Sequence, residues 1–256
     1  MKGQAMKSKP LILLVALYLP AFLAAQTLPP ASSVLEDYVQ AVGGRAALEK
    51  VQNRVVHATI TVPAQGLSMT SLTYTDDSGR SYTRIESPLF GKIESGVNGE
   101  TVWSVHPMAG ARLLTGAEAK LQASISRLDQ LADWKTGFDA VETVGTETVE
   151  GAPCYRVVAQ IEGVPNQVFY FDQASKLLVK MGLTAETPQG PVTVDSFIGD
   201  YRDVDGVKLP FRTRTVQLGQ EILSVTDSVK QNGEIPDTVF AVPAAIQALM
   251  KPSATE

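Results

Sequence analysis

The sequence of 256 residues is poor in the side chains on which most metal and redox sites depend. It contains one cysteine, Cys154, and two histidines, His57 and His106. A single cysteine excludes an intrachain disulfide and a cysteine-ligated zinc site, and two histidines leave little for a histidine-rich metal centre. We therefore expect no metal site and no cofactor.

Sequence motifs of the common catalytic sites are also absent. The chain has no Gly-x-Ser-x-Gly nucleophile elbow, no Walker A loop and no His-Glu-x-x-His zinc motif. His57 lies in an alternating stretch on the side opposite to its apolar residues, and His106 precedes Pro107 in an expected loop. Cys154 opens an expected strand, where a buried thiol is usually inert. We predict no catalytic residues and no enzymatic activity, with a hydrolase as the weaker alternative.

Long hydrophobic runs are limited to one segment near the N-terminus. Three lysines precede an apolar stretch that is short for a membrane span, and the small residues Ala24 and Ala25 follow it. This order predicts a secretory signal peptide over residues 1–25, with an uncleaved anchor as the alternative. No cysteine follows the stretch, which excludes the lipid attachment of a bacterial lipoprotein. We expect an exported protein with no transmembrane segment in the mature chain.

Positive charge is scarce as well. The full chain has 22 basic and 27 acidic residues, and removal of residues 1–25 with their three lysines changes the net charge from −5 to −8. An acidic chain lacks the cationic face that phosphate binding requires, which argues against a nucleic-acid partner. Adhesion to anionic lipid by charge alone is disfavoured for the same reason, so any lipid contact would be apolar.

Alternation of apolar and polar residues dominates the rest of the sequence. The first such run is Val55–Val62, and turn pairs such as Asn98-Gly99, Glu150-Gly151 and Asp205-Gly206 follow at strand-length intervals. Pairs of this kind suit the tight hairpin turn in which both central residues need positive φ. About ten or eleven strands joined by short links predict an antiparallel meander, and a sheet of this length tends to curl. The fold class is therefore mainly β.

Two helices are expected beside the sheet. The first follows a Pro/Ser-rich linker, residues 26–33, where Ser33 and Glu36 have the spacing of a capping box. The second begins at another such pair, Thr115 and Glu118, and is apolar on one face. This second helix either plugs the core of the sheet or acts as a lid over a cavity. Its lid residues would be Leu121, Ile125, Leu128 and Trp134.

Three segments carry motifs of one known family. They are LEDYVQAVGGRAALEKV at Leu35–Val51; GTETVEGAPCYRVVAQ and YFDQASKLLVKM within Gly145–Met181; and DYRDVDGVKLPF at Asp200–Phe211, followed by IPDTVFAVP at Ile235–Pro243. In this order they resemble the bacterial outer-membrane lipoprotein-sorting family, the LolA-like exported domains. The similarity predicts one domain over residues 34–243, with residues 244–256 as a C-terminal tail.

The resemblance implies a strongly curved, unclosed antiparallel half-barrel with helices over its concave side. The best-known members of the family hold acyl chains of lipoproteins in that apolar hollow and carry them across the periplasm. We therefore expect an uncharacterised branch of this family: a monomeric carrier in the periplasm of a Gram-negative bacterium, whose partner is a lipid acyl chain or a lipoprotein. The alternative is an envelope protein-interaction or sensing module that uses the same fold with a filled core.

The candidate ligand-binding residues are those that alternation places on the inner face of the curved sheet. Methionine and aromatic side chains suit a variable apolar guest, because they adapt or present a broad surface. The alternative is an ordinary sealed core, and a shift of one residue in strand phase would exchange the two faces. The predicted set is Val56, Ile60, Met69, Trp103, Val105, Phe169, Phe171, Val179, Met181, Val194 and Phe197.

Overall fold

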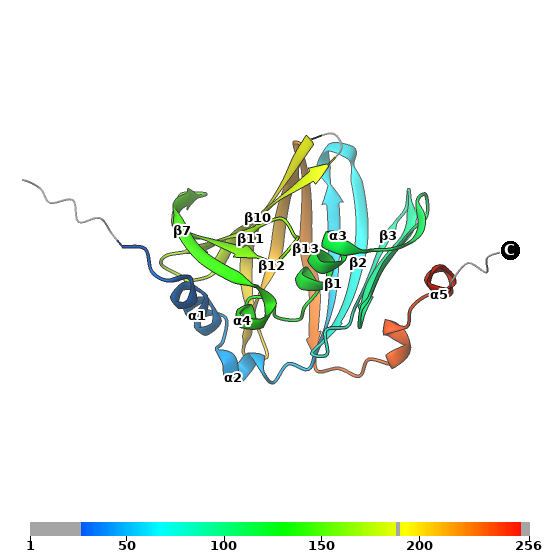
Figure 1. Cartoon of the computed structure of the whole chain (residues 1–256), viewed down its shortest axis with the longest axis horizontal. Coiled ribbons are helices and arrows are strands. Elements are labelled where there is room, and N and C mark those ends of the chain that lie inside the picture. Colours follow the sequence, from blue (N-terminus) through cyan, green and yellow to red (C-terminus); the bar gives the residue numbers. More distant parts are fainter. Residues whose placement is uncertain (1–26, 188–189, 252–256) are drawn as a thin grey trace, which may run out of the picture.

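The computed structural model describes residues 27–187 and 190–251. The expected signal peptide, residues 1–25, lies outside this range. In the described part of the chain, thirteen strands form one antiparallel sheet that is not closed into a barrel (Figure 1). The expected half-barrel is thus confirmed, with thirteen strands in place of ten or eleven. No helix within the described ranges is long and apolar enough to cross a membrane.

Two meanders build the sheet. The first contains β1 (Asn53–Val62), β2 (Leu67–Asp76), β3 (Ser81–Ser87), β4 (Gly91–Asn98), β5 (Thr101–His106) and β6 (Gly110–Leu113). The second contains β7 (Ala140–Val149), β8 (Ala152–Gln160), β9 (Gln167–Asp172), β10 (Leu178–Thr187), β11 (Gly190–Val204), β12 (Val207–Gln217) and β13 (Gln220–Gln231). Strands β1 and β13 pair in the middle, so β6 and β7 form the two edges. The segment between β6 and β7 must therefore cross from one edge of the sheet to the other.

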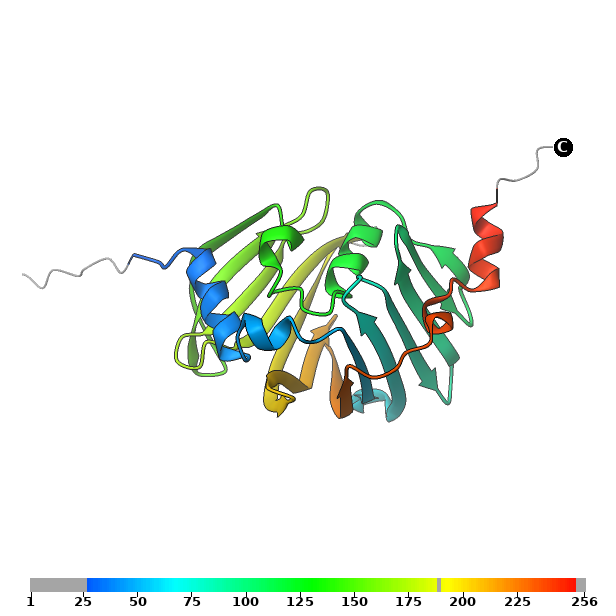
Figure 2. The ribbon, with the colours of Figure 1, turned by 90° about the horizontal axis from the view of Figure 1, so that it is seen from below.

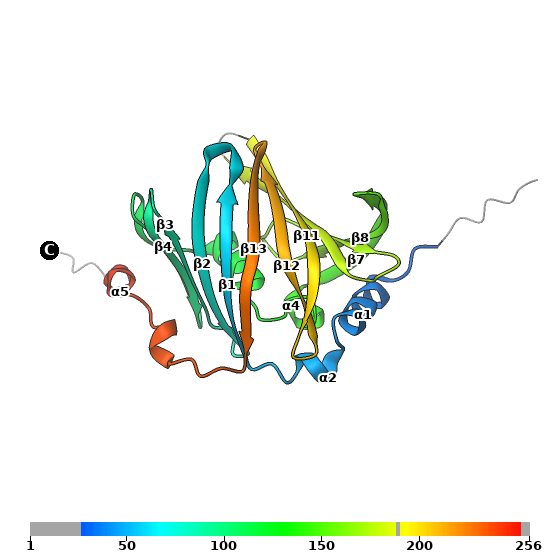
Figure 3. The same ribbon diagram turned by 180° about the vertical axis from the view of Figure 1, so that it is seen from behind.

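This crossing segment contains α3 (Gly116–Ile125) and α4 (Trp134–Gly137), joined by residues 126–133, here called the crossing loop. The expected single helix from Thr115 to Trp134 is thus divided into two. Figures 1 and 3 show α3 and α4 on one face of the sheet, and Figure 2 shows that the sheet curves around them. Helices α1 (Ala31–Ala41) and α2 (Arg45–Leu48) lie at the lower rim.

Neither expected capping box forms. Helices α1 and α3 have no side-chain cap hydrogen bond at their starts. Glu36, expected to cap with Ser33, pairs with Arg45 at 2.6 Å. Glu118 likewise pairs with Arg112 at 2.6 Å. A hydrogen bond between two charged groups is stronger than one to a neutral amide, so both carboxylates turn to arginine.

Buried apolar residues gather in separate clusters. The α1 cluster combines α1 with β8 and β9 through Val34, Leu35, Phe138, Val157, Phe169 and Phe171. The α2 cluster contains Val39, Val42, Leu48, Val51 and Val207, and the α3 cluster contains Val97, Val102 and Leu114. A fourth, the outer cluster, contains Val149, Cys154 and Tyr170 on the convex face. The helices thus fill parts of the concave side rather than all of it.

The C-terminal segment covers the convex face of the first meander. A short 3₁₀ turn, Asp237–Phe240, contacts β3 and β4, and α5 (Ala244–Met250) contacts β6. Arg80 lies over the ring of Phe240 at 4.6 Å, and Ile246 of α5 is fully buried. Figure 2 shows α5 outside the curve of the sheet. This helix lies within the residues expected as a C-terminal tail, 244–256.

Candidate ligand-binding site

Cross-strand register identifies the concave face of the first meander. Val97 on β4 packs against Ala123 of α3, and direct pairing through β3 and β2 leads from Val97 to Arg54 on β1. Paired residues share a face, and so do alternate residues along a strand. Val56 and Ile60 therefore face the concave side, together with Met69, the β2 partner of Ile60.

The second meander is assigned in the same way. Phe169 and Phe171 belong to the α1 cluster, and Met181 pairs with Phe169. Ser196, the partner of Met181, lies two residues from Val194 on β11. Seven of the eleven predicted residues therefore lie on the concave face.

Trp103 and Val105, which were also expected there, lie on the convex face. Trp103 alternates with Val102, which faces α3, and its ring packs directly on Gly96 and beside Tyr82. A Cβ at Gly96 would come within 2.6 Å of that ring, so only glycine fits. The prediction was wrong by one residue of strand phase.

Val179 and Phe197 also face the convex side, where they pack on the outer cluster. A β-bulge between Leu178 and Lys180 inserts one residue into β10, so Leu178 and Met181 both face inward while Val179 does not. Alternation cannot be extended through such an insertion. Phe197 neighbours Ser196, the inward residue of β11, and the Arg214 guanidinium lies over its ring at 4.0 Å.

Of the four predicted lid residues, two pack against buried clusters and two lie on α3 with at least part of the side chain exposed. Leu128 packs against the α2 cluster, and Trp134 packs against the α1 cluster. Leu121 is half-buried, and Ile125 at the end of α3 is 47% exposed. Of the four, the two that pack on buried clusters thus belong to the crossing loop and α4.

Apolar residues on the concave face of the middle strands remain incompletely covered. Val56, Ile60, Met69, Val194 and Ile222 are all half-buried. Ile222 shares this face because its β12 partner, Thr215, also pairs with Ser196. Among the described residues, none of these five belongs to a buried cluster. The middle of the concave face is therefore an apolar surface without a complete cover; we call it the hollow.

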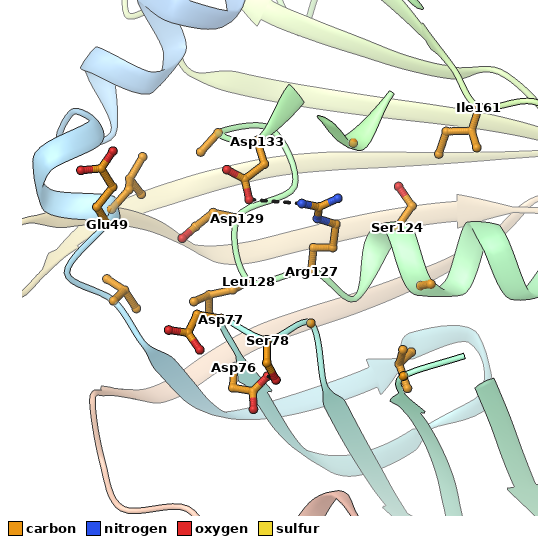
Figure 4. Close-up of a pocket in the computed structure, with 18 of the residues that line it drawn as sticks. Glu49, Asp76, Asp77, Ser78, Ser124, Arg127, Leu128, Asp129, Asp133 and Ile161 are labelled. Carbon is orange, nitrogen blue, oxygen red and sulfur yellow. Dashed lines mark hydrogen bonds and ion pairs between the residues drawn. The ribbon is translucent and has the colours of Figure 1, made fainter. Parts of the chain in front are cut away.

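A cleft of about 740 Å³ opens beside the crossing loop (Figure 4). Its lining includes Ile161, which packs on the α1 cluster, Leu48 and Val51 of the α2 cluster, and Val97 of the α3 cluster. The three helix-side clusters thus meet around unfilled space. The volume lies within the range of about 300–1,000 Å³ typical of ligand sites. Of the predicted ligand and lid residues, only Leu128 is among the lining residues described.

The sequence reasoning missed the charged lining of this cleft. Asp76 and Asp77 belong to a turn motif in the sequence, and nothing in that motif indicates that they lie beside α2 and the crossing loop. The charged lining residues are Arg45, Glu49, Asp76, Asp77, Lys120, Arg127, Asp129 and Asp133. Within the described ranges, no three His, Cys, Asp or Glu side chains are arranged to hold a metal ion.

Arg54 anchors the crossing loop to the sheet. Its Nη1 donates to the Leu128 carbonyl oxygen at 3.0 Å, and its Nη2 lies 3.5 Å from Asp129 Oδ1. The two side chains are only 11% and 19% exposed. Burial raises the pKa of Asp129 above its ordinary value, and the positive charge of Arg54 offsets only part of this effect.

Two further contacts hold the same loop. Arg45 Nη1 donates to the Ala132 carbonyl oxygen at 3.3 Å. The Gln130 Nε2 group donates to Ser124 Oγ at 2.7 Å and to Gln167 Oε1 at 3.1 Å. The loop is thus held by polar contacts together with the apolar contacts of Leu128, Leu131 and Ala132, and among residues 126–133 only Leu131 is buried.

Three solved structures share this architecture. A DUF1329 family protein from Desulfovibrio piger superposes with a TM-score of 0.59 at 16% identity, over 85% of this chain and 100% of that one. A LolA superfamily protein from Nitrosomonas europaea gives 0.56 at 14% identity, over 84% and 99%. This chain has the LolA-like fold.

A putative outer membrane lipoprotein-sorting protein domain from Vibrio parahaemolyticus has the same LolA-like fold, with a TM-score of 0.54 at 11% identity, over 82% of this chain and 97% of that one. No family model and no curated protein matches the sequence. The resemblance seen in the sequence motifs is therefore confirmed at the level of the fold. None of the three names indicates a catalytic family.

Proposed function

We propose that this protein is an exported, non-catalytic carrier of the periplasm that shelters an acyl chain or another apolar ligand on the concave face of its sheet. One observation carries the proposal: the five apolar residues of the hollow lie outside every buried cluster described, on the concave face that the helices cover only in part. The LolA-like fold supports it, because one relative with this fold is named a lipoprotein-sorting domain.

The energetics of such a site need no charge or metal. Burial of an acyl chain contributes about 0.8 kcal/mol per CH₂ group, so a dozen carbons contribute about 10 kcal/mol before the cost of association. Val56, Ile60 and Met69 offer the adaptable apolar surface that such a guest requires.

A carrier must also admit and release its guest. The crossing loop lies at the cleft and is held by hydrogen bonds from Arg45, Arg54 and Gln130. Segments with few buried apolar contacts open locally at a lower free energy than the core of a domain. We therefore assign the gate to the crossing loop rather than to α3 alone.

The test is native mass spectrometry of protein purified without a lipid-stripping step. We expect co-purifying lipid with the wild type and its loss in Ile60→Asp, which places a charge in the hollow. The matched control is Val225→Asp, because Val225 lies on the convex face of β13 and is 43% exposed. No bound lipid in the wild type would refute the carrier. A protein partner that both variants retain would then favour the interaction module.

A further inference from the structure

We propose that the side-chain amide of Gln167 is a polar anchor at the edge of the hollow, which donates a hydrogen bond to the carbonyl oxygen of an acyl ester or fatty acid. The inference rests on the proposed function and names its ligand class: an acyl chain that ends in a carbonyl group, in preference to a plain hydrocarbon.

Gln167 stands on the concave face of β9. It pairs with Ala159, a member of the α1 cluster, and lies two residues before Phe169 in the same strand. On β10 its partner is the half-buried Leu183, which pairs in turn with Val194 of the hollow. The side chain is therefore surrounded by the apolar wall that an acyl chain would contact.

The amide is buried, and of its two polar atoms only the oxygen has a hydrogen-bond partner among the described residues. Gln167 is 1% exposed, and its Oε1 accepts a hydrogen bond from Gln130 Nε2 at 3.1 Å. Its own Nε2 group has no hydrogen-bond partner among the described residues. A buried donor without an acceptor costs about 1–3 kcal/mol, so such a group is rarely retained in a packed core without a role.

The position of Gln167 links it to the gate. Ser124 lines the cleft, Gln130 of the crossing loop donates to Ser124, and the same Gln130 amide reaches Gln167. This chain of hydrogen bonds runs from the cleft wall to the sheet. When the loop moves aside, Gln130 leaves Gln167, and the amide is then exposed to a ligand in the hollow.

An oxygen acceptor is the complement of this group. The Nε2 group supplies two N–H donors, which suit a carbonyl oxygen and find no acceptor on a hydrocarbon. The surrounding wall is apolar, so the hydrogen bond forms away from competing water and fixes the carbonyl end of the chain. Gln167 therefore determines how the ligand is oriented, while the apolar surface supplies most of the affinity.

The experiment compares two competitors for the apolar dye N-phenyl-1-naphthylamine bound to the full mature chain. Methyl palmitate carries an ester carbonyl, and hexadecane does not. The variant Gln167→Met keeps the volume and removes the two donors together with the Oε1 acceptor of Gln130. Gln130→Met is the control for the lost hydrogen bond, and Gln160→Met at the exposed end of β8 is the control for the substitution itself. We expect the apparent affinity for methyl palmitate to fall about three- to tenfold in Gln167→Met, with hexadecane and dye binding unchanged.

Urea unfolding of the ligand-free variant separates this role from a structural one. Because Gln167→Met also removes the Oε1 atom that accepts from Gln130, its stability is compared with that of Gln130→Met, which breaks the same hydrogen bond from the loop side. Gln167→Met is expected to be no less stable than Gln130→Met, since it also removes an unpaired buried donor, whereas a structural role of the Gln167 donors would make it less stable. Equal weakening of both competitors, or no change in either, would overturn the anchor while leaving the carrier intact. Absence of dye and competitor binding in the wild type would refute the carrier itself. Gln167→Leu is the second variant, and failure of both to fold would assign Gln167 to structure and overturn the proposal.

Discussion

Replacement of Arg54 by methionine should loosen the crossing loop without unfolding the sheet. The variant removes the hydrogen bond to the Leu128 carbonyl oxygen and leaves Asp129 without its cationic partner in a site where that carboxyl is 19% exposed. A hydrogen bond that involves a charged group contributes about 1.5–3 kcal/mol. We take about 2 kcal/mol as the loss in the free energy of local opening, which corresponds to about thirtyfold.

Amide hydrogen exchange measures this opening directly. The amides of Ala132 and Asp133, which both donate to the Asp129 carbonyl oxygen, should exchange about thirtyfold faster in Arg54→Met. The Phe169 amide in β9 should keep its protection, because the strand pairings with β8 and β10 do not involve Arg54. The matched control is Arg212→Met on β12, which removes one exposed arginine at a distance from the loop.

Two results would refute this reasoning. Unchanged protection of Ala132 and Asp133 in a folded variant would show that Arg54 does not anchor the loop. Equal acceleration at Phe169 would show that the whole domain, rather than the loop, had lost stability. The double variant Arg54→Met/Asp129→Asn separates the two effects, because it no longer buries an unpaired carboxylate and should recover global stability while the loop stays mobile.

Other predictions concern the carboxyls and the thiol. Burial raises the pKa of Asp129 in the folded state, so its contribution to stability is present below its ordinary pKa of 3.8 and is lost as the pH rises. In urea unfolding, the stability of Asp129→Asn relative to wild type should therefore be higher at pH 7 than at pH 4. Asp76 should behave in the opposite way because, although burial raises its pKa, hydrogen bonds from Ser78 and Arg80 together lower it below 3.8. Its contribution to stability is therefore lost as the pH falls, and Asp76→Asn should be most destabilising at neutral pH. The same pH dependence for both variants would contradict the opposite pKa shifts of Asp129 and Asp76. Burial also raises the pKa of the Cys154 thiol, so a disulfide reagent at pH 8 should label it only after unfolding in urea, and rapid labelling of the native protein would show that β8 opens.

Local sequence was sufficient to predict the hairpin turns, although it failed for the two capping boxes. The hairpin between β11 and β12 turns at Asp205 and Gly206 with φ of 51° and 85°, as expected for an Asp-Gly pair, because the positive φ is a property of the turn itself. The same holds at Glu150-Gly151, with φ of 48° and 89°. Alternation also predicted the inward face of β1, where Val56 and Ile60 lie on the concave side. The site itself was only partly predictable: the concave residues Phe169 and Met181 were found, whereas Gln167 carried no signal in the sequence.

The sequence by itself therefore determined the fold class, the turns and the phase of strands such as β1, because each depends on residues a few positions apart. It did not determine the phase of β5, where Trp103 and Val105 face the convex side although the strand has no insertion. Only the tertiary structure decided that β1 pairs with β13, that the bulge in β10 turns Val179 outward, and that Arg54 meets Asp129 across 75 residues. It also decided that three apolar clusters leave a cleft between them. These features arise from contacts between segments that are distant in the chain, and the pattern of any one segment carries no record of its partner.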